Sequence, residues 1–294
     1  MIWSLLDPIR RAVIEGTFEA DAARPDYRDL LHVITCACGQ RLDACEFWHA
    51  VLEAAFGPFD AIPFDRFLYL HGRLAMHLSI PRFVSPLKTE AYRSELAEYR
   101  DVLARLYGAV AAVSGATTII DSSKSAAYGL ILKSVQAVRL STLHLVRDSR
   151  AVAYSWTRDT DSSVGKRMLP RPVALSAWRW NRENLTAELL AARSPASLRV
   201  RYEDFVRDPK HTFRELNRRL GLPQPMLSED NTAALATNHV VMGNPLRFQT
   251  GSVRIRIDDE WQTKLRPRDR RIATLLTWPL LLRYGYALSQ PALR

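Results

Sequence analysis

The 294-residue chain lacks the features that would send it into or across a membrane. The nearest candidate for a membrane span, over 272–282, falls short of the roughly 18 apolar residues that cross a bilayer and contains Pro279. It therefore predicts a core helix rather than a peripheral membrane contact. The first residues do not show the ordered basic, apolar and cleavage segments of a secretory signal. We expect a cytoplasmic protein without a transmembrane segment.

Lysine is scarce as well, because only six of the 41 basic residues are lysines. The net charge of +10 has two interpretations. The arginines can reflect a GC-rich genome, which composition alone favours, or they can serve an anionic ligand, since the planar guanidinium binds phosphate and sulfate. The basic residues form neither a dense tail nor a run interleaved with aromatic residues. We therefore expect no nucleic acid among the partners.

Cysteine is rare and confined to one stretch, in which Cys36, Cys38 and Cys45 lie between His32 and His49. An odd number of cysteines in a reducing compartment argues against a disulfide framework. A Cys₃His zinc site with a nearby histidine is one interpretation, although the Cys-x-Cys spacing is tighter than usual. Free thiols in a turn are the other, and we assign no metal from the sequence.

Hydrophobic periodicity predicts an alternation of helices and buried strands from residue 90 onward. The expected strands are short and aliphatic, and they span Thr117–Asp121, 141–146 and 197–202. The expected helices follow three- and four-residue apolar spacing, and they span 90–113, 122–138, about 149 onward, 172–193 and 210–220. Ser122 or Ser123 is the expected N-cap of the second helix, and Gly115 and Gly221 are the expected ends of the first and last. This alternation predicts βαβ units with a parallel sheet.

Basic residues gather where the predicted strands lead into helices. Arg147 ends one strand, Arg150 follows it, and Lys124 follows the neighbouring strand. Ligands of parallel sheets bind at the carboxyl ends of strands, and helix N-termini favour anions. The pattern predicts a phosphate or sulfate site, and surface caps with ion pairs are the alternative.

Five segments, taken in order, resemble the PAPS-dependent sulfotransferases of the bacterial branch; PAPS is 3′-phosphoadenosine 5′-phosphosulfate. They are "CACGQRLDACEFW", "IIDSSKS", "LHLVRDSRAVAYS", "LRVRYEDFVRDP" and "HVVMGNPLRFQTGSVRIRIDDEW". The resemblance implies an α/β fold, a three-layer sandwich with a central parallel sheet of the P-loop NTPase-like type. It also implies a single domain over 1–294 with a cysteine-rich insert at about 32–50.

The resemblance assigns roles to individual residues of the nucleotide site. Arg147 and Ser155 would hold the 3′-phosphate, and Tyr202 would contact the adenine side. Arg247 and Gly251 lie in the segment that gives relatives a second clamp on this phosphate, although the usual arginine two residues before the glycine is here a glutamine.

Two further residues are candidates for the catalytic machinery. Lys124 resembles a lysine that faces the sulfonate and the acceptor in some relatives. A base for the acceptor is also needed, and the candidates are His71, His77, His144 and His239. His239, next to the closing loop, is the preferred candidate, and His144 is expected to be buried within its strand.

The sequence departs from the family pattern at its start. The family begins with a strand and a Gly-Arg-Ser-Gly-Thr-Thr-like loop, whose backbone N–H groups hold the 5′-phosphosulfate. The first glycine here, Gly16, has no such neighbours, and 1–15 is predicted to be helical. We expect a chain that starts too late, through gene-model error or genuine loss, and a diverged N-terminus is the alternative. Either one leaves the first strand of the sheet and the sulfonate-binding loop in question.

Three functions therefore stay open from the sequence. The first is transfer of a sulfonate group from PAPS to a hydroxyl or amine of a small-molecule, lipid or carbohydrate acceptor. The second is non-catalytic binding of PAPS or 3′,5′-ADP, since the phosphosulfate loop is not found. A P-loop-type kinase ranks last, because no Gly-Lys-Ser/Thr sequence is present.

Overall fold

The computed structural model describes residues 34–288 except 124, 159, 162–166, 169, 224, 226 and 242–244. The chain divides into two compact units. Of the described residues, the first unit comprises 34–140 and Ala236–Thr250, and the second comprises the remainder. The helix predicted over 1–15 lies outside the described residues. The single domain over 1–294 stays a prediction.

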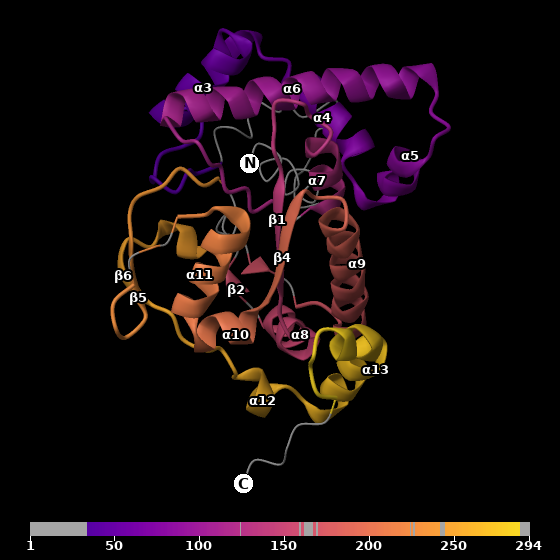
Figure 1. The fold of residues 1–294 in the computed structure, drawn as a ribbon, viewed down its shortest axis with the longest axis vertical. Helices are drawn as coiled ribbons and strands as arrows, with labels where there is room; N and C mark the ends of the chain where they lie inside the picture. The colour runs from indigo at the N-terminus through magenta and orange to yellow at the C-terminus, as the bar shows by residue number, and fades with distance from the viewer. Residues whose placement is uncertain are drawn as a thin grey trace. The chain divides into compact units, whose positions relative to one another are not determined.

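The first unit is helical in its described part (Figure 1). Its α-helices are α3 (Glu46–Phe56), α4 (Phe64–Leu74), α5 (Ile80–Val84), α6 (Glu90–Ser114) and α7 (Ala126–Leu132). Its short 3₁₀ helices are η1 (Phe59–Ala61), η2 (His77–Ser79) and η3 (Pro245–Phe248). The Thr89 side chain caps α6 by accepting the Tyr92 N–H at 3.3 Å, and Gly115 ends it with φ of 66°. The prediction of this long helix and its glycine end is confirmed.

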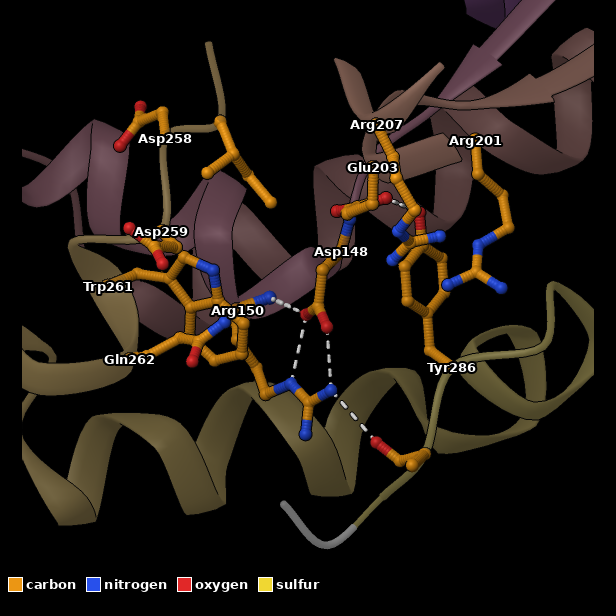
Figure 2. Close-up of a pocket in the computed structure, with 12 residues that line it drawn as sticks. Asp148, Arg150, Arg201, Glu203, Arg207, Asp258, Asp259, Trp261, Gln262 and Tyr286 are labelled. Atoms are coloured by element: carbon orange, nitrogen blue, oxygen red, sulfur yellow. Dashed lines mark hydrogen bonds and ion pairs between the residues drawn. The ribbon is translucent and has the colours of Figure 1, made fainter. Parts of the chain in front are cut away.

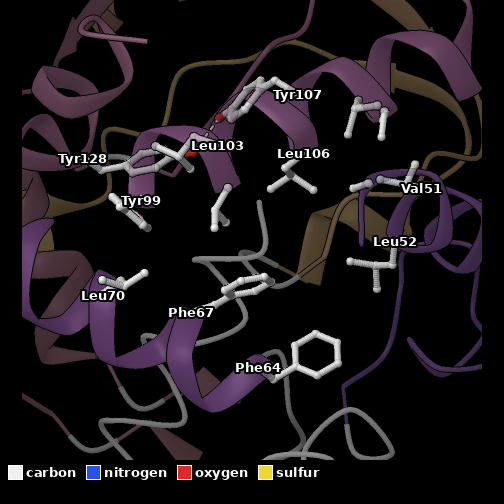
Figure 3. Close-up of a cluster of buried hydrophobic side chains, with 14 of the residues drawn as sticks. Val51, Leu52, Phe64, Phe67, Leu70, Tyr99, Leu103, Leu106, Tyr107 and Tyr128 are labelled. Carbon is white, nitrogen blue, oxygen red and sulfur yellow. Dashed lines mark hydrogen bonds between the residues drawn. The ribbon is translucent and has the colours of Figure 1, made fainter. Parts of the chain in front are cut away.

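The hydrophobic core of this unit lies between α3, α4, α6 and α7 (Figure 3). Leu52, Leu70 and Leu103 are buried completely or almost so. Burying a side chain of this size stabilises the fold by about 1.5–3 kcal/mol relative to leaving it exposed. The hydroxyls of two buried tyrosines have partners, because the Tyr107 hydroxyl donates to Asp121 and lies 2.8 Å from the Tyr128 hydroxyl.

The prediction of a buried strand over Thr117–Asp121 is wrong. These residues form no strand with any described residue, and the Ile120 side chain is 74% exposed. The predicted helix after it is also shorter than expected, and Ser125 caps it by accepting the Tyr128 N–H at 3.3 Å. The reason is local, because the Asp121 carboxylate accepts the Ser123 N–H at 2.8 Å and folds these residues into a turn.

The second unit combines a small parallel sheet with helices. Its strands are β1 (Ser141–Val146), β2 (Thr160–Asp161), β3 (Arg167–Met168), β4 (Ala196–Arg201), β5 (Thr232–Leu235) and β6 (Gly251–Arg254). Its helices are α8 (Ser149–Thr157), α9 (Val173–Ala191), α10 (Tyr202–Arg207), α11 (Pro209–Leu220), α12 (Trp261–Lys264) and α13 (Pro267–Arg283). β1 and β4 pair in parallel, whereas β2–β3 and β5–β6 pair antiparallel. The predicted mixed α/β character with parallel strands is confirmed.

One face of β1 carries the buried side chains of the sheet. Thr142, His144 and Val146 point towards α9, whereas Leu143 and Leu145 on the other face are 44% and 53% exposed. β1 is therefore buried on one face rather than on both, which corrects the expectation of a fully buried strand. Figure 1 shows α9 and α11 on either side of the β1–β4 pair.

The apolar run over 272–282 lies within α13, as predicted, and Pro279 is inside the helix. Thr277, Leu280 and Leu281 are buried, while Leu275 is 72% exposed. In the part of the chain that the structure describes, no helix has the length and the apolar character that crossing a membrane requires.

Candidate anion-binding site

Two residues expected to bind the nucleotide lie together at the carboxyl end of the parallel sheet. Val146 of β1 pairs with Arg201 of β4, so Arg147 and Tyr202 are the residues that directly follow these two strands. The central carbon of the Arg147 guanidinium lies 4.6 Å from the centre of the Tyr202 ring. Such a cation–π contact contributes about 0.5–2 kcal/mol. The Trp180 indole N–H donates to the Arg147 carbonyl at 2.9 Å and fixes the backbone at this point.

The Arg147 guanidinium already holds one anionic partner. Its Nη2 donates to the backbone carbonyl of Asp258 at 2.9 Å and lies 3.0 Å from the Asp258 carboxylate. The two side chains are 23% and 36% exposed, so solvent reaches the pair. Because a phosphate presents the same kind of oxygen acceptors as a carboxylate, Asp258 holds the position that an incoming anion would need.

Arg150, expected on the rim of the anion site, is instead buried with its donors occupied. Its Nη2 lies 2.6 Å from Oδ2 of Asp148, and its Nε donates to Oδ1 at 2.9 Å. Its Nη1 and Nη2 also donate to the carbonyls of Leu288 and Ala287. The Asp148 carboxylate caps α8 as well, by accepting the Arg150 N–H at 2.8 Å. Arg150 therefore ties the start of α8 to the chain after α13.

A pocket of about 210 Å³ lies beside this pair (Figure 2). Its charged lining residues are Asp148, Arg150, Arg201, Glu203, Arg207, Asp258 and Asp259. Arg201 and Arg207 both pair with Asp204, at 3.7 and 3.0 Å. Glu203 accepts a hydrogen bond from the Tyr286 hydroxyl at 2.7 Å. The pKa of Tyr286 is raised well above its usual range, mainly by burial and to a smaller extent by this carboxylate. Carboxylates outnumber arginines here, so the pocket itself does not favour an anion.

The structure places the other expected nucleotide-binding residues separately. Ser155 is half-buried in α8. Gly251 opens β6 with φ of 86° and pairs with Leu235. Arg247 belongs to the first unit, where it is 9% exposed and its Nη2 donates to the Thr35 carbonyl at 3.4 Å. Lys124 lies outside the described residues. The roles of these four residues stay predictions.

The histidines proposed as bases have different surroundings. His144 is buried as predicted, with its Nε2 at 2.9 Å from Oδ1 of Asn184, and burial lowers its pKa. His71 lies 2.8 Å from the Tyr99 hydroxyl through its Nδ1. The Nδ1 of His239 lies 3.4 Å from the Cys45 thiol and 3.6 Å from the Cys36 thiol. His239 is thus the histidine that joins the cysteines.

The three cysteines carry free thiols and form no disulfide bond, in agreement with the sequence. Burial raises the pKa of Cys36 to about 12. Burial also acts to raise the pKa of Cys38, but hydrogen bonds from the Gln40 N–H and from the neighbouring thiols outweigh it, and the pKa of Cys38 is lowered. His49, one histidine considered beside them, pairs with Glu53 at 3.5 Å and stacks on Phe59. His32 lies outside the described residues.

Sequence reasoning did not single out Asp258, nor the pairing of Asp148 with Arg150. A signal for Asp258 was present, because it lies in the segment expected to close over the nucleotide and its acidic neighbours follow directly. A signal for the second pair was the acid immediately before a predicted helix, which is typical of an N-cap.

A comparison with protein families bears on this geometry. The profile described as the sulfotransferase family matches residues 69–226, which includes β1, β4 and the Arg147–Tyr202 stack. The match covers more than half of the chain, and the chain belongs to the sulfotransferase family. A sulfotransfer activity in general follows from this membership. The search of curated proteins found no match.

Proposed function

We propose that this chain transfers a sulfonate group from PAPS to a hydroxyl or amine of a small-molecule, lipid or carbohydrate acceptor in the cytoplasm. The observation that carries the proposal is the stack of Arg147 on Tyr202 at the carboxyl ends of two paired parallel strands, inside the family match. Parallel sheets bind ligands at this end of their strands. We also infer that β1 and β4 belong to the central sheet of a three-layer sandwich.

In this proposal Arg147 binds the 3′-phosphate, which distinguishes PAPS from nucleotides such as ATP. The phosphate replaces the Asp258 carboxylate at the guanidinium, Ser155 adds a hydroxyl donor, and Tyr202 flanks the adenine. Charge-assisted hydrogen bonds of this kind contribute about 1.5–3 kcal/mol. Gly251 is proposed as a second contact with this phosphate.

The proposed chemistry is an in-line displacement at sulfur. The bond between sulfur and the bridging oxygen of the 5′-phosphate breaks while the acceptor oxygen or nitrogen bonds to sulfur, and a base takes the acceptor proton. By analogy with phosphoryl transfer, the transition state is loose, so the protein mainly positions the groups and stabilises charge. Arg147 lies on the nucleotide side and binds ground and transition states alike, so it supplies affinity rather than rate. Lys124 is the proposed partner of the sulfonate.

Binding of 3′,5′-ADP, measured by calorimetry, tests the role of Arg147. We expect Arg147→Ala to weaken 3′,5′-ADP about ten- to a hundredfold, as the loss of a charge-assisted contact implies. Binding of 5′-AMP, which has no 3′-phosphate, should change little. Equal losses for both ligands, or no loss for either, would contradict the assignment.

Arg199, in the neighbouring strand β4, offers a matched control. It stacks on Tyr284 at 5.0 Å and pairs with Glu188 at 3.3 Å, so it has the same two kinds of partner as Arg147. Arg199→Ala should leave 3′,5′-ADP affinity unchanged. A similar loss in this variant would mean that the effect at Arg147 comes from a disturbed β1–β4 sheet rather than from the phosphate.

Radiolabelled PAPS with a panel of hydroxyl and amine acceptors tests the transfer itself. Labelled product supports the sulfotransferase proposal. Binding of 3′,5′-ADP without any turnover supports the non-catalytic alternative, and preference for ATP over 3′,5′-ADP in competition supports a kinase.

A further inference from the structure

Four metal-binding side chains converge in the first unit, outside the residues that the family profile matches. The thiol sulfurs of Cys36, Cys38 and Cys45 and a ring nitrogen of His239 all lie within 4.8 Å of one another. The histidine is separated from Cys36 by 203 positions in the sequence. Its arrival at this point therefore comes from the fold and not from local spacing.

Three of the distances within the cluster match the edges of a tetrahedral zinc site. For bonds of about 2.3 Å to sulfur and about 2.0–2.1 Å to nitrogen, the edges of the tetrahedron are about 3.8 Å between two sulfurs and about 3.6 Å between sulfur and nitrogen. The Cys38 and Cys45 sulfurs are 3.7 Å apart. The His239 Nδ1 lies 3.6 Å from the Cys36 sulfur and 3.4 Å from the Cys45 sulfur.

The backbone holds the ligands together independently of any ion. Cys36 pairs with Val241 in an antiparallel bridge, and the Ala37 N–H donates to the Val240 carbonyl at 3.0 Å. These contacts bring the segment that carries His239 against the cysteine turn. Gly39 closes that turn with φ of 90°, a value that glycine adopts without strain.

The groups around the ligands match the surroundings of a metal site. Burial raises the pKa of Cys36 and Cys45, and backbone groups of Cys38 and Trp48 act in the opposite direction, as the backbone of Gln40 does for Cys38. The Phe47 ring stacks on the His239 ring at 4.7 Å, and the Trp48 indole N–H donates to the His239 carbonyl at 2.8 Å. Such outer contacts stabilise thiolates and fix the orientation of the imidazole.

We propose that Cys36, Cys38, Cys45 and His239 bind a zinc ion in a structural Cys₃His site. Three sulfurs and one imidazole nitrogen in a tetrahedron favour zinc among the divalent metals. Four protein ligands leave no open position, so the site stabilises the fold and does not act on substrate. Each thiol loses its proton to solvent when the zinc–sulfur bond forms.

Charge around the site is consistent with this assignment. Three thiolates and one zinc ion leave a single net negative charge. Arg247 is buried in the same unit, and the Cys36 sulfur lies close enough to oppose the effect of burial on the guanidinium. Its positive charge offsets the negative charge of the zinc centre.

The assignment changes the interpretation of His239 and does not depend on sulfonate transfer. His239 ligates the metal through Nδ1, so it is not the base for the acceptor. The zinc ion also joins the start of α3 to residues 236–241, two segments that backbone hydrogen bonds alone would hold less firmly.

Metal analysis of the full chain tests the proposal. The protein is produced in zinc-containing medium with an affinity tag that has no histidines, and its metal content is measured by mass spectrometry. We expect about one zinc ion per chain, and release of this zinc when a mercurial reagent titrates the thiols. A protein that holds no zinc, or that binds it only in proportion to added metal and loses it on desalting, would overturn the proposal.

Substitutions locate the ion. Cys38→Ser and His239→Phe should each lower the bound zinc to a small fraction, and the phenylalanine keeps an aromatic ring against Phe47. His49→Gln is the matched control, because His49 is the neighbouring histidine that lies outside the cluster. Full zinc content in His239→Phe, or equal loss in His49→Gln, would contradict the ligand set.

A measurement on the unaltered chain tests the site without relying on variants, which can fail to fold. Replacing zinc by cobalt should give thiolate-to-cobalt charge transfer and the intense visible bands of tetrahedral coordination. Alkylation followed by mass spectrometry detects the competing outcome, which is a disulfide between the thiols. A Cys38–Cys45 disulfide in protein purified without oxidant would show that the thiols pair with each other instead of binding a metal.

Discussion

The cysteine cluster of the first unit and the arginine site of the second unit arrange charge in opposite ways. In the cluster, three cysteine sulfurs and a histidine ring nitrogen lie close to one another, and the metal ion that would neutralise the thiolates comes from solution. In the arginine site, Arg147 and Arg150 each already hold a carboxylate of the chain. The first arrangement is suited to adding a ligand, whereas the second is suited to exchanging one.

The two arginine pairs also differ from each other in burial. The side chains of Arg150 and Asp148 are 4% and 5% exposed, whereas those of Arg147 and Asp258 are 23% and 36% exposed. A buried pair is costly to break because one charge is left without a partner, while a partly exposed pair is worth little. The difference indicates that Arg150 serves the fold and that Arg147 is available for a ligand.

The largest effect is expected from Asp148→Ala. The substitution leaves the Arg150 guanidinium buried without its carboxylate and removes the N-cap of α8. Breaking a buried pair in this way costs about 3–5 kcal/mol. Urea unfolding followed by circular dichroism measures the change in the free energy of unfolding.

The exposed pair of Glu215 with Arg218, at 2.7 Å on α11, gives the control for this experiment. Glu215→Ala should leave the urea midpoint almost unchanged, because solvent replaces the lost partner. A loss in Asp148→Ala no greater than in Glu215→Ala would erase the distinction between the two arginine pairs.

A smaller effect, which is a gain in affinity for 3′,5′-ADP, is expected from Asp258→Asn. The variant removes the charge that competes for Arg147, and a partly exposed ion pair is worth up to about 1 kcal/mol. Affinity for 3′,5′-ADP should therefore rise by up to about fivefold in calorimetry. Asp259→Asn, one residue further on, should leave the affinity unchanged. Weaker binding by Asp258→Asn would mean that Asp258 supports the ligand site rather than competing for Arg147.

The smallest effect is a pH dependence of the free energy of unfolding, and it extends the comparison to two histidines. His239 lies among thiols, whereas His144 pairs with an amide and burial lowers its pKa. The folded chain therefore keeps His144 neutral at pH values where the unfolded chain binds a proton. Stability should be constant above the ordinary histidine pKa of about 6.5 and fall as pH drops below it towards the folded-state pKa.

The free energy of unfolding, measured across this pH range, tests the role of His144. His144→Gln should flatten the pH dependence, because glutamine has no titrating group. His211→Gln, on the exposed surface of α11, should leave the dependence as it is. A pH dependence that survives in His144→Gln would assign it to another group.

Local features of the fold could be predicted from the sequence because neighbouring residues determine them. The apolar stripe predicted α6, the aliphatic runs predicted β1 and β4, and Gly115 and Gly221 ended their helices as expected. Thr117–Asp121 has the same aliphatic character, but a strand needs a partner that its own residues do not specify. The Asp121 side chain instead fixes a turn.

The candidate sites were predictable only where their residues are close in sequence. Arg147 and the cysteine triplet stand out as short motifs. Asp258 reaches Arg147 across 111 positions and His239 reaches Cys45 across 194, so their pairing depends on the tertiary fold. Sequence reasoning named His239 for a different purpose because no local pattern links it to the cysteines.

The unbroken register between β1 and β4 sets which changes in chain length the second unit can tolerate. The strands pair residue for residue from Ser141 with Ala196 to Val146 with Arg201. One residue inserted into either strand would turn every following side chain of that strand to the opposite face, and Tyr202 would no longer lie beside Arg147. Insertions between the strands, in the loop before α9 or after it, leave this register intact. Related sequences should therefore vary in length between these strands but keep each strand at a constant length.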